Sequence, residues 1–192
     1  RQACDGGGRL NPAQLESLLR LFRRQVRLIR VFHVTLSGGT AAAVLWASRL
    51  PSPDNKRAMF AVFIGTLVIW ALMIVSSARV GRYVRTAGAL LSLGQLDDAE
   101  VWLRRVLERF SMSARTKIIA CQQFASLFFR RDDHPNVVKI CSELLKQRLT
   151  RLHSIWINTR LMMADSLLML DRVPEAYDAI RPVYDAPLSL SD

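Results

Sequence analysis

Two stretches of the chain lack charged side chains altogether, although Asp, Glu, Lys and Arg make up 22% of its residues. They are VFHVTLSGGTAAAVLWAS, residues 31–48, and AMFAVFIGTLVIWALMIVSSA, residues 58–78. As helices, these 18 and 21 residues would extend roughly 27 and 31 Å, about the hydrocarbon thickness of a bilayer. We therefore expect a transmembrane helical hairpin over residues 31–85, with Pro51 and Pro53 closing its first helix.

A hairpin buried inside a soluble protein is one alternative to this interpretation. It would require a large apolar surrounding, whereas the rest of the chain is amphipathic rather than uniformly apolar. A second alternative is a soluble helical protein whose apolar hairpin binds the surface of a partner.

Cysteine is scarce, and the common motifs for catalysis are missing. The three cysteines are odd in number and have no CxxC spacing, which indicates neither a disulfide framework nor a zinc site. The sequence contains no GxSxG, HExxH or phosphate-binding glycine loop. The Asp97-Asp98 and Asp132-Asp133 pairs stand at expected helix starts, where carboxylates cap backbone N–H groups. We expect a protein that is not an enzyme and that takes no cofactor and no small-molecule substrate.

The net charge of +11 would suit nucleic acid, but its distribution does not. Residues 1–30 carry a net +5, residues 49–57 +2 and residues 79–85 +3, whereas residues 87–192 carry only +1. Ten of the eleven excess charges thus flank the expected spans, where arginine contacts anionic lipid headgroups, and nucleic-acid binding is not expected. The arginines assigned to headgroups are Arg20, Arg23, Arg24, Arg27, Arg30, Arg79, Arg82 and Arg85.

The flanks of the hairpin carry more positive charge than its loop. The positive-inside tendency therefore places both termini on the cytosolic or matrix side of an integral membrane protein. A mitochondrial inner membrane and a bacterial inner membrane fit this orientation equally well.

Residues 1–30 are expected to form a flexible start and then a basic amphipathic helix. Asn11 as N-cap and Gln14 three residues later indicate where the helix begins. Apolar residues then recur at helical spacing over residues 15–29, with arginines between them. We expect a juxtamembrane helix that lies on anionic lipid and continues into the first span. The alternative is a helix that packs on the C-terminal part of the chain.

Small residues at four-residue spacing occur in both spans, and such faces allow two helix backbones to approach closely. They are Gly38, Gly39, Ala42 and Ala43 in the first span and Ala61 and Gly65 in the second. Whether these faces close the hairpin or bind a helix of another subunit is open.

His33 is the one ionisable side chain inside an expected span. An intramembrane histidine can ligate haem or carry protons, which gives an alternative function as a cofactor-binding or transport component of a membrane redox complex. Because His33 lies only three residues after Arg30, near headgroup depth, we expect an interfacial hydrogen bond instead.

Residues 86–192 contain a repeated pattern of a turn followed by an amphipathic helix. The repeated segments are LGQLDDAEVWLRRVL (93–107), DDHPNVVKICSELL (132–145) and LDRVPEAYDAIRPVY (170–184). The equivalent positions Ala99, Val138 and Ala176 are 39 and 38 residues apart. Other stretches with apolar residues at helical spacing run between these three helices.

This pattern resembles the tetratricopeptide repeat (TPR) family over roughly residues 86–185. The first segment carries the match, with Gly94 at the turn and then Ala99 and Leu103. The third has Asp171 where glycine is usual. The spacing exceeds the family's usual length of about 34 residues, so we expect the first helix of each pair to be longer than usual.

The resemblance implies a solenoid of about three helix pairs that docks other proteins in a concave groove. Exposed polar residues on the first helices of the pairs are the candidate docking residues: Lys117, Gln122, Gln123, Arg130, Asn158 and Arg160. Helical spacing places Trp102 and Trp156 in the core of the repeats.

These features predict an all-α protein with a two-helix transmembrane hairpin and a TPR-like α-solenoid. The expected function is that of a membrane-anchored, non-catalytic scaffold or adaptor, or of an accessory subunit in the assembly of a larger membrane complex. Its expected partners are other protein subunits and anionic lipid. A fission-type or import-type organelle adaptor is another version of this hypothesis.

Overall fold

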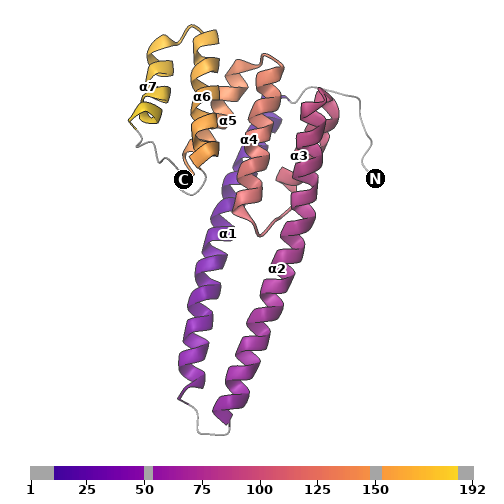
Figure 1. The fold of residues 1–192 in the computed structure, drawn as a ribbon, viewed down its shortest axis with the longest axis vertical. Helices are drawn as coiled ribbons and strands as arrows, with labels where there is room; N and C mark the ends of the chain where they lie inside the picture. Colours follow the sequence, from indigo (N-terminus) through magenta and orange to yellow (C-terminus); the bar gives the residue numbers. More distant parts are fainter. Residues whose placement is uncertain (1–10, 50–53, 148–152, 186–192) are drawn as a thin grey trace, which may run out of the picture.

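The computed structural model describes residues 11–49, 54–147 and 153–185, and all regular structure in them is helical (Figure 1). The helices of these segments are α1 (Pro12–Ala47), α2 (Asp54–Ser92), α3 (Leu96–Glu108), α4 (Ala114–Arg130), α5 (His134–Leu145), α6 (His153–Met169) and α7 (Val173–Tyr184). The all-α prediction is confirmed for this part of the chain. The expected flexible start, Pro51 and Pro53 lie outside the described residues.

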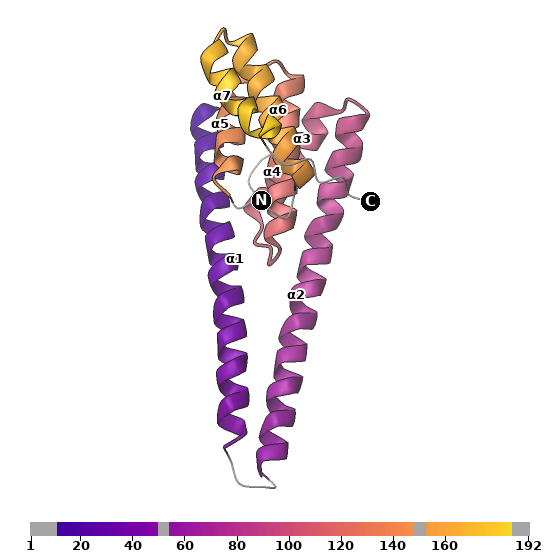
Figure 2. The ribbon, with the colours of Figure 1, turned by 60° about the vertical axis from the view of Figure 1, so that its left-hand side comes forward.

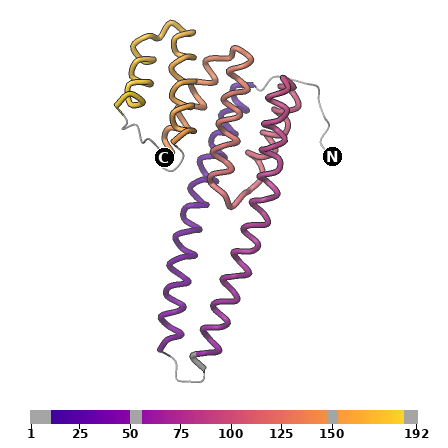
Figure 3. Tube along the Cα trace, in the orientation of Figure 1, coloured from indigo at the N-terminus to yellow at the C-terminus, as the bar shows by residue number. Residues whose placement is uncertain are grey.

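The two long helices run through the boundaries that the sequence suggested between domains. Helix α1 joins the basic segment to the first apolar run, and α2 joins the second apolar run to the first repeat, without a break in either (Figure 3). Asn11 caps α1 as predicted, and its backbone N–H donates to Gln14 Oε1 at 3.3 Å. The bundle and the hairpin are therefore connected by two continuous helices.

The end of α2 and the five shorter helices form three pairs, α2–α3, α4–α5 and α6–α7 (Figures 1 and 2). Gly94, Asp132 and Asp171 occupy the same place in the three turns, with φ of 76°, 57° and 58°. The N–H of the following residue donates to the carbonyl five residues back in each turn, at 2.9 to 3.0 Å, as in a Schellman motif. The turns recur after 38 and 39 residues, so the chain has a structural repeat, but the residue equivalent to Ala99 and Ala176 is the buried Val137 and not the half-buried Val138 that the sequence suggested.

The N-terminal half of α1 packs across α3, α4 and α5. Its residues Leu15, Leu19, Phe22 and Val26 are at most 2% exposed and share the main core with Leu103 of α3. The expectation that this apolar face lies on lipid is therefore wrong, and the alternative of packing on the C-terminal part is confirmed. An apolar stripe alone does not say whether lipid or protein covers it.

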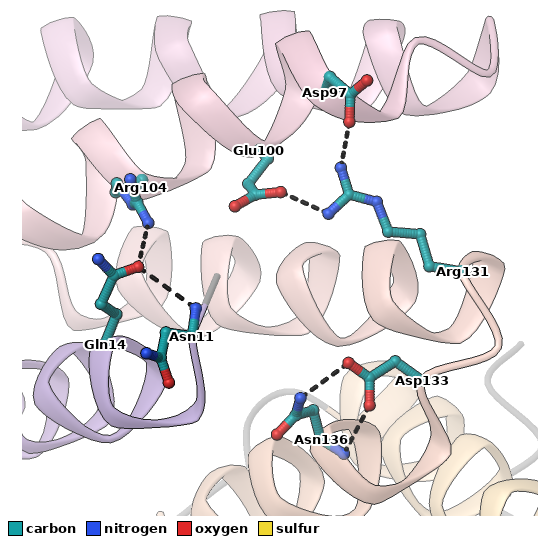
Figure 4. Close-up of polar contacts among 8 residues, drawn as sticks. All are labelled: Asn11, Gln14, Asp97, Glu100, Arg104, Arg131, Asp133 and Asn136. Atoms are coloured by element: carbon teal, nitrogen blue, oxygen red, sulfur yellow. Dashed lines mark hydrogen bonds and ion pairs between the residues drawn. The ribbon is translucent and has the colours of Figure 1, made fainter. Parts of the chain in front are cut away.

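Polar contacts around this core join the helices (Figure 4). Arg131, in the α4–α5 turn, pairs with Glu100 and Asp97 of α3. Arg104 Nη2 donates to Gln14 Oε1 at 3.3 Å, which joins α3 to the start of α1. The bundle thus holds α1 by apolar packing at its centre and by hydrogen bonds at its rim.

Candidate functional surfaces

The apolar halves of α1 and α2 project away from the bundle (Figure 2). Both helices are long and apolar enough to cross a membrane, and only 6% of the apolar window of each is buried. A core helix of a soluble protein would instead be mostly buried. The largest exposed side chains here include Val34, Leu45, Trp46, Phe60, Phe63, Leu67, Trp70 and Leu72. No described residue covers this surface, and exposed apolar surface of this kind is typical of contacts with lipid or with another protein.

The small-residue faces do not bring the two spans together within the described chain. A Cβ atom on Gly38, Gly39 or Gly65 would meet no atom within 4 Å. Ala42 and Ala61 are exposed and Ala43 is half-buried. The spans enclose a cleft of about 630 Å³ instead, lined by residues that include Leu36, Thr40, Val44, Thr66 and Trp70.

His33 lines this cleft and a second one of about 690 Å³ next to the α3–α4 turn. Its Nδ1 lies 2.7 Å from the carbonyl oxygen of Ile29 in the same helix. Because a carbonyl only accepts, Nδ1 is the donor in this contact. Among the described residues, no cluster of three His, Cys, Asp or Glu side chains could hold a metal ion.

The arginines predicted at lipid headgroups occupy different environments. Arg23 pairs with Glu143 of α5 at 3.2 Å, and Arg30 donates to Gln147 at 3.1 Å, so both hold α1 against the bundle. Arg20 lies eleven residues before the first apolar run, about 16 Å along the helix. That distance exceeds the depth of a headgroup layer, about 5 to 8 Å. The others, Arg24, Arg27, Arg79, Arg82 and Arg85, are exposed.

A groove of about 490 Å³ lies between α4 and α6, the first helices of the second and third pairs. Within the described residues α1 does not contact α6 or α7, so it leaves this groove open. Leu161 and Leu168 in the groove are 44% and 52% exposed, and Asp165 is the one charged side chain of the lining. The lining consists of Gln122, Ser126, Phe129, Asn158, Leu161, Met162, Ala164, Asp165, Leu168 and Ile180.

Gln122 and Asn158 are the two predicted docking residues that line this groove. Gln123 packs against α2 instead, because a Cβ atom on Gly88 would lie only 2.9 Å from Gln123 Nε2. Glycine at position 88 thus allows α2 and α4 to approach each other at this side chain.

Lys117 is fully buried, which corrects the prediction that it is exposed for docking. Its Nζ donates to the carbonyls of Val106 at 2.6 Å and Leu107 at 3.0 Å, and to that of Arg109. These carbonyls lie at the end of α3, where a helix leaves its acceptors unpaired. Burial lowers the pKa of Lys117 to about 8.

Arg130 and Arg160, also predicted to dock partners, donate to the backbone of neighbouring helices. Arg130 Nη1 donates to the Leu91 carbonyl near the end of α2. Arg160 Nη1 donates to the Ala179 carbonyl of α7 at 2.8 Å, and its guanidinium carbon lies 4.9 Å from the centroid of the half-buried Trp156 ring. Both arginines join helices of the repeats, and neither lines the groove.

Cys121 and Cys141 are free thiols buried in the core. Burial raises the pKa of both, that of Cys141 to about 12. Neither is a thiolate at neutral pH, so neither has the activation that a nucleophilic cysteine requires.

No family model, no curated protein and no solved structure matches the chain.

Proposed function

We propose that this protein is a membrane-anchored, non-catalytic scaffold or accessory subunit of a larger membrane complex. The hairpin spans the bilayer, and the bundle stands on the cytosolic or matrix side together with both termini. The helix pairs act as TPR-like repeats, and the groove between α4 and α6 binds a segment of another subunit.

The observation that carries this proposal is the change of environment along each long helix. In α1, Phe22 and Val26 are fully buried in the core, whereas Val34 and Leu45 of the same helix are 72% and 66% exposed. Exposure of so many apolar side chains to water is unfavourable by roughly 25 cal/mol per Å². A bilayer around the apolar halves of α1 and α2 removes this cost and leaves the packed bundle in water.

The chemistry of the groove supports a protein ligand. Its exposed leucines provide apolar contacts, and Gln122 and Asn158 provide hydrogen bonds. An amphipathic helix that inserts its apolar side chains between α4 and α6 fits this pattern. Asp165 favours a neutral or basic side chain at the rim of such a helix.

Site-specific photocrosslinking in native membranes tests this docking. A photoreactive residue at Leu168 should give one discrete crosslinked partner, and Leu161→Arg should abolish that product. Leu93, which is 72% exposed and lies outside the groove, provides both controls. A photoreactive residue there should not capture the partner, and Leu93→Arg should not affect capture from Leu168. Equal capture from the two positions, or capture that survives Leu161→Arg, would contradict the proposal.

A further inference from the structure

A cavity of about 850 Å³ lies between α2, directly beyond its apolar run, and the end of α3. Its lining residues include Arg79, Arg82 and Arg109 and no Asp or Glu. Arg79 and Arg82 form no side-chain hydrogen bond or ion pair with another described residue. Three cations gathered in this way repel one another, and a bound anion relieves that repulsion.

Arg109 is held in place by aromatic side chains rather than by an acidic partner. Its Nη1 donates to the Tyr83 hydroxyl at 3.2 Å, and its guanidinium carbon lies 5.3 Å from the centroid of that ring. The Tyr83 ring stacks on Trp102 with 5.3 Å between centroids. A guanidinium has five N–H donors, and only one is used by a described residue. Arg109 is therefore positioned while most of its donors remain available to a ligand.

The position of the cavity along α2 matches the depth of lipid headgroups. Arg79 directly follows the apolar run at residues 58–78. Arg82 and Tyr83 lie about 6 and 8 Å beyond the end of that run, and the headgroup layer is about 5 to 8 Å deep on each side of a bilayer. Within the apolar run, Leu72 and Val75 of α2 are 66% and 49% exposed. The basic cavity thus adjoins an apolar surface that lies at the depth of the acyl chains.

We propose that this cavity binds the phosphate of an anionic glycerophospholipid, an inference that rests on the proposed membrane insertion. The phosphate oxygens accept hydrogen bonds from Arg79, Arg82 and Arg109, and charge-assisted bonds of this kind are stronger than neutral ones. The acyl chains lie along the exposed apolar surface that includes Leu72 and Val75. A free phosphate shares the headgroup chemistry but gains nothing from that apolar surface.

Native mass spectrometry of the full chain in mild detergent tests this site, with dioleoyl phosphatidylglycerol and dioleoyl phosphatidylcholine as probes. Phosphatidylglycerol should bind at least about tenfold more tightly than phosphatidylcholine, and Arg79→Gln/Arg82→Gln should weaken its binding about tenfold or more. Arg109→Gln should weaken it as well. The matched control, Arg172→Gln/Arg181→Gln, removes the same charge from exposed positions at α7 outside the cavity. It should leave the affinity within about twofold.

Circular dichroism melting of the variants shows whether each is folded. Equal weakening by the two double variants would attribute the effect to net charge and overturn the site, as would equal affinity for the two lipids. Binding of inorganic phosphate as tightly as phosphatidylglycerol would remove the role of the acyl chains and also overturn it. Failure of groove docking leaves these results unchanged, because Leu161 does not line the cavity. Failure of membrane insertion appears separately, as release of the chain by carbonate extraction.

Discussion

Lys117 of α4 donates its ammonium group to the carbonyl of Val106, 2.6 Å away at the end of α3. The same nitrogen also donates to the carbonyls of Leu107 and Arg109. One buried cation therefore supplies hydrogen bonds to acceptors that a helix end leaves unpaired inside a core. The α3–α4 turn that it stabilises is the part of the bundle nearest the hairpin, where Met112 lines a cleft together with Met73 of α2.

Replacement of Lys117 by an apolar residue should lower the stability of the fold. We expect Lys117→Met to lower the free energy of unfolding by about 2 to 3 kcal/mol, because buried carbonyls lose their donor. Lys139→Met is the matched control, since the Lys139 side chain is 43% exposed and forms a surface pair with Glu16. Its cost should stay below about 1 kcal/mol. Denaturation of both variants in the same detergent measures the two losses, and similar losses would contradict the capping role.

The pH dependence of stability should carry the signature of Lys117. Its pKa is lowered to about 8 in the folded chain from the ordinary value of 10.5. Between these values the unfolded chain binds more protons than the folded one, so stability rises with pH by up to about 1.4 kcal/mol per unit. The difference in unfolding free energy between the wild type and Lys117→Met isolates this effect. A difference that stays flat from about pH 7 to about pH 10 would contradict the lowered pKa.

The left-handed turn residues offer a test of the repeat. Asp171→Gly should stabilise the chain by about 1 kcal/mol, because a side chain is strained at positive φ, and Gly94→Ala should destabilise it by a similar amount. Asp178→Gly, at an exposed position within α7, should instead destabilise by about 1 kcal/mol. Thermal melting of the three variants gives the order of their stabilities. Destabilisation by Asp171→Gly would show that the third turn differs from the first.

The contribution of each ion pair of the bundle to the free energy of unfolding should depend on how deeply the pair is buried. Arg131→Met leaves Glu100, whose side chain is 10% exposed, without its partner and should cost about 2 to 3 kcal/mol. Arg172→Met breaks a pair with Glu175 in which the side chains are 47% and 56% exposed, and should cost much less than Arg131→Met. Equal losses of unfolding free energy in denaturation experiments would show that burial does not determine how much these pairs stabilise the chain.

Local signals in the sequence were sufficient to predict the helices and their turns. Asn11 and Gln14 indicated the start of α1, and the four-residue capping pattern depends only on neighbouring residues. Gly94 indicated the first repeat turn, and the spacing of the repeat led correctly to Asp171 but to Asp133 in the second turn, where the left-handed residue is Asp132. The absence of charge predicted two helices that can cross a membrane.

Contacts between helices were harder to predict, because they depend on which face each helix presents to its neighbours. Lys117 was assigned to the surface by its charge, although it shares a helical stripe with Cys121, Phe124 and Phe128, all of which are buried. That helical spacing was the signal in the sequence that could have predicted the burial of Lys117. The basic cavity had no comparable signal, since Arg109 meets Tyr83 only because α3 folds back along α2.

The central claim is that the hairpin crosses a membrane while the bundle stays on one side. In a chain with its native cysteines replaced by alanine, Ser48→Cys marks the turn of the hairpin and Tyr184→Cys marks the last helix, both at exposed positions. A membrane-impermeant maleimide should label Tyr184→Cys only from the cytosolic or matrix side of sealed membranes, and Ser48→Cys only from the opposite side. Labelling of both positions from the same side would contradict the transmembrane hairpin and make its apolar surface an interface for a soluble partner.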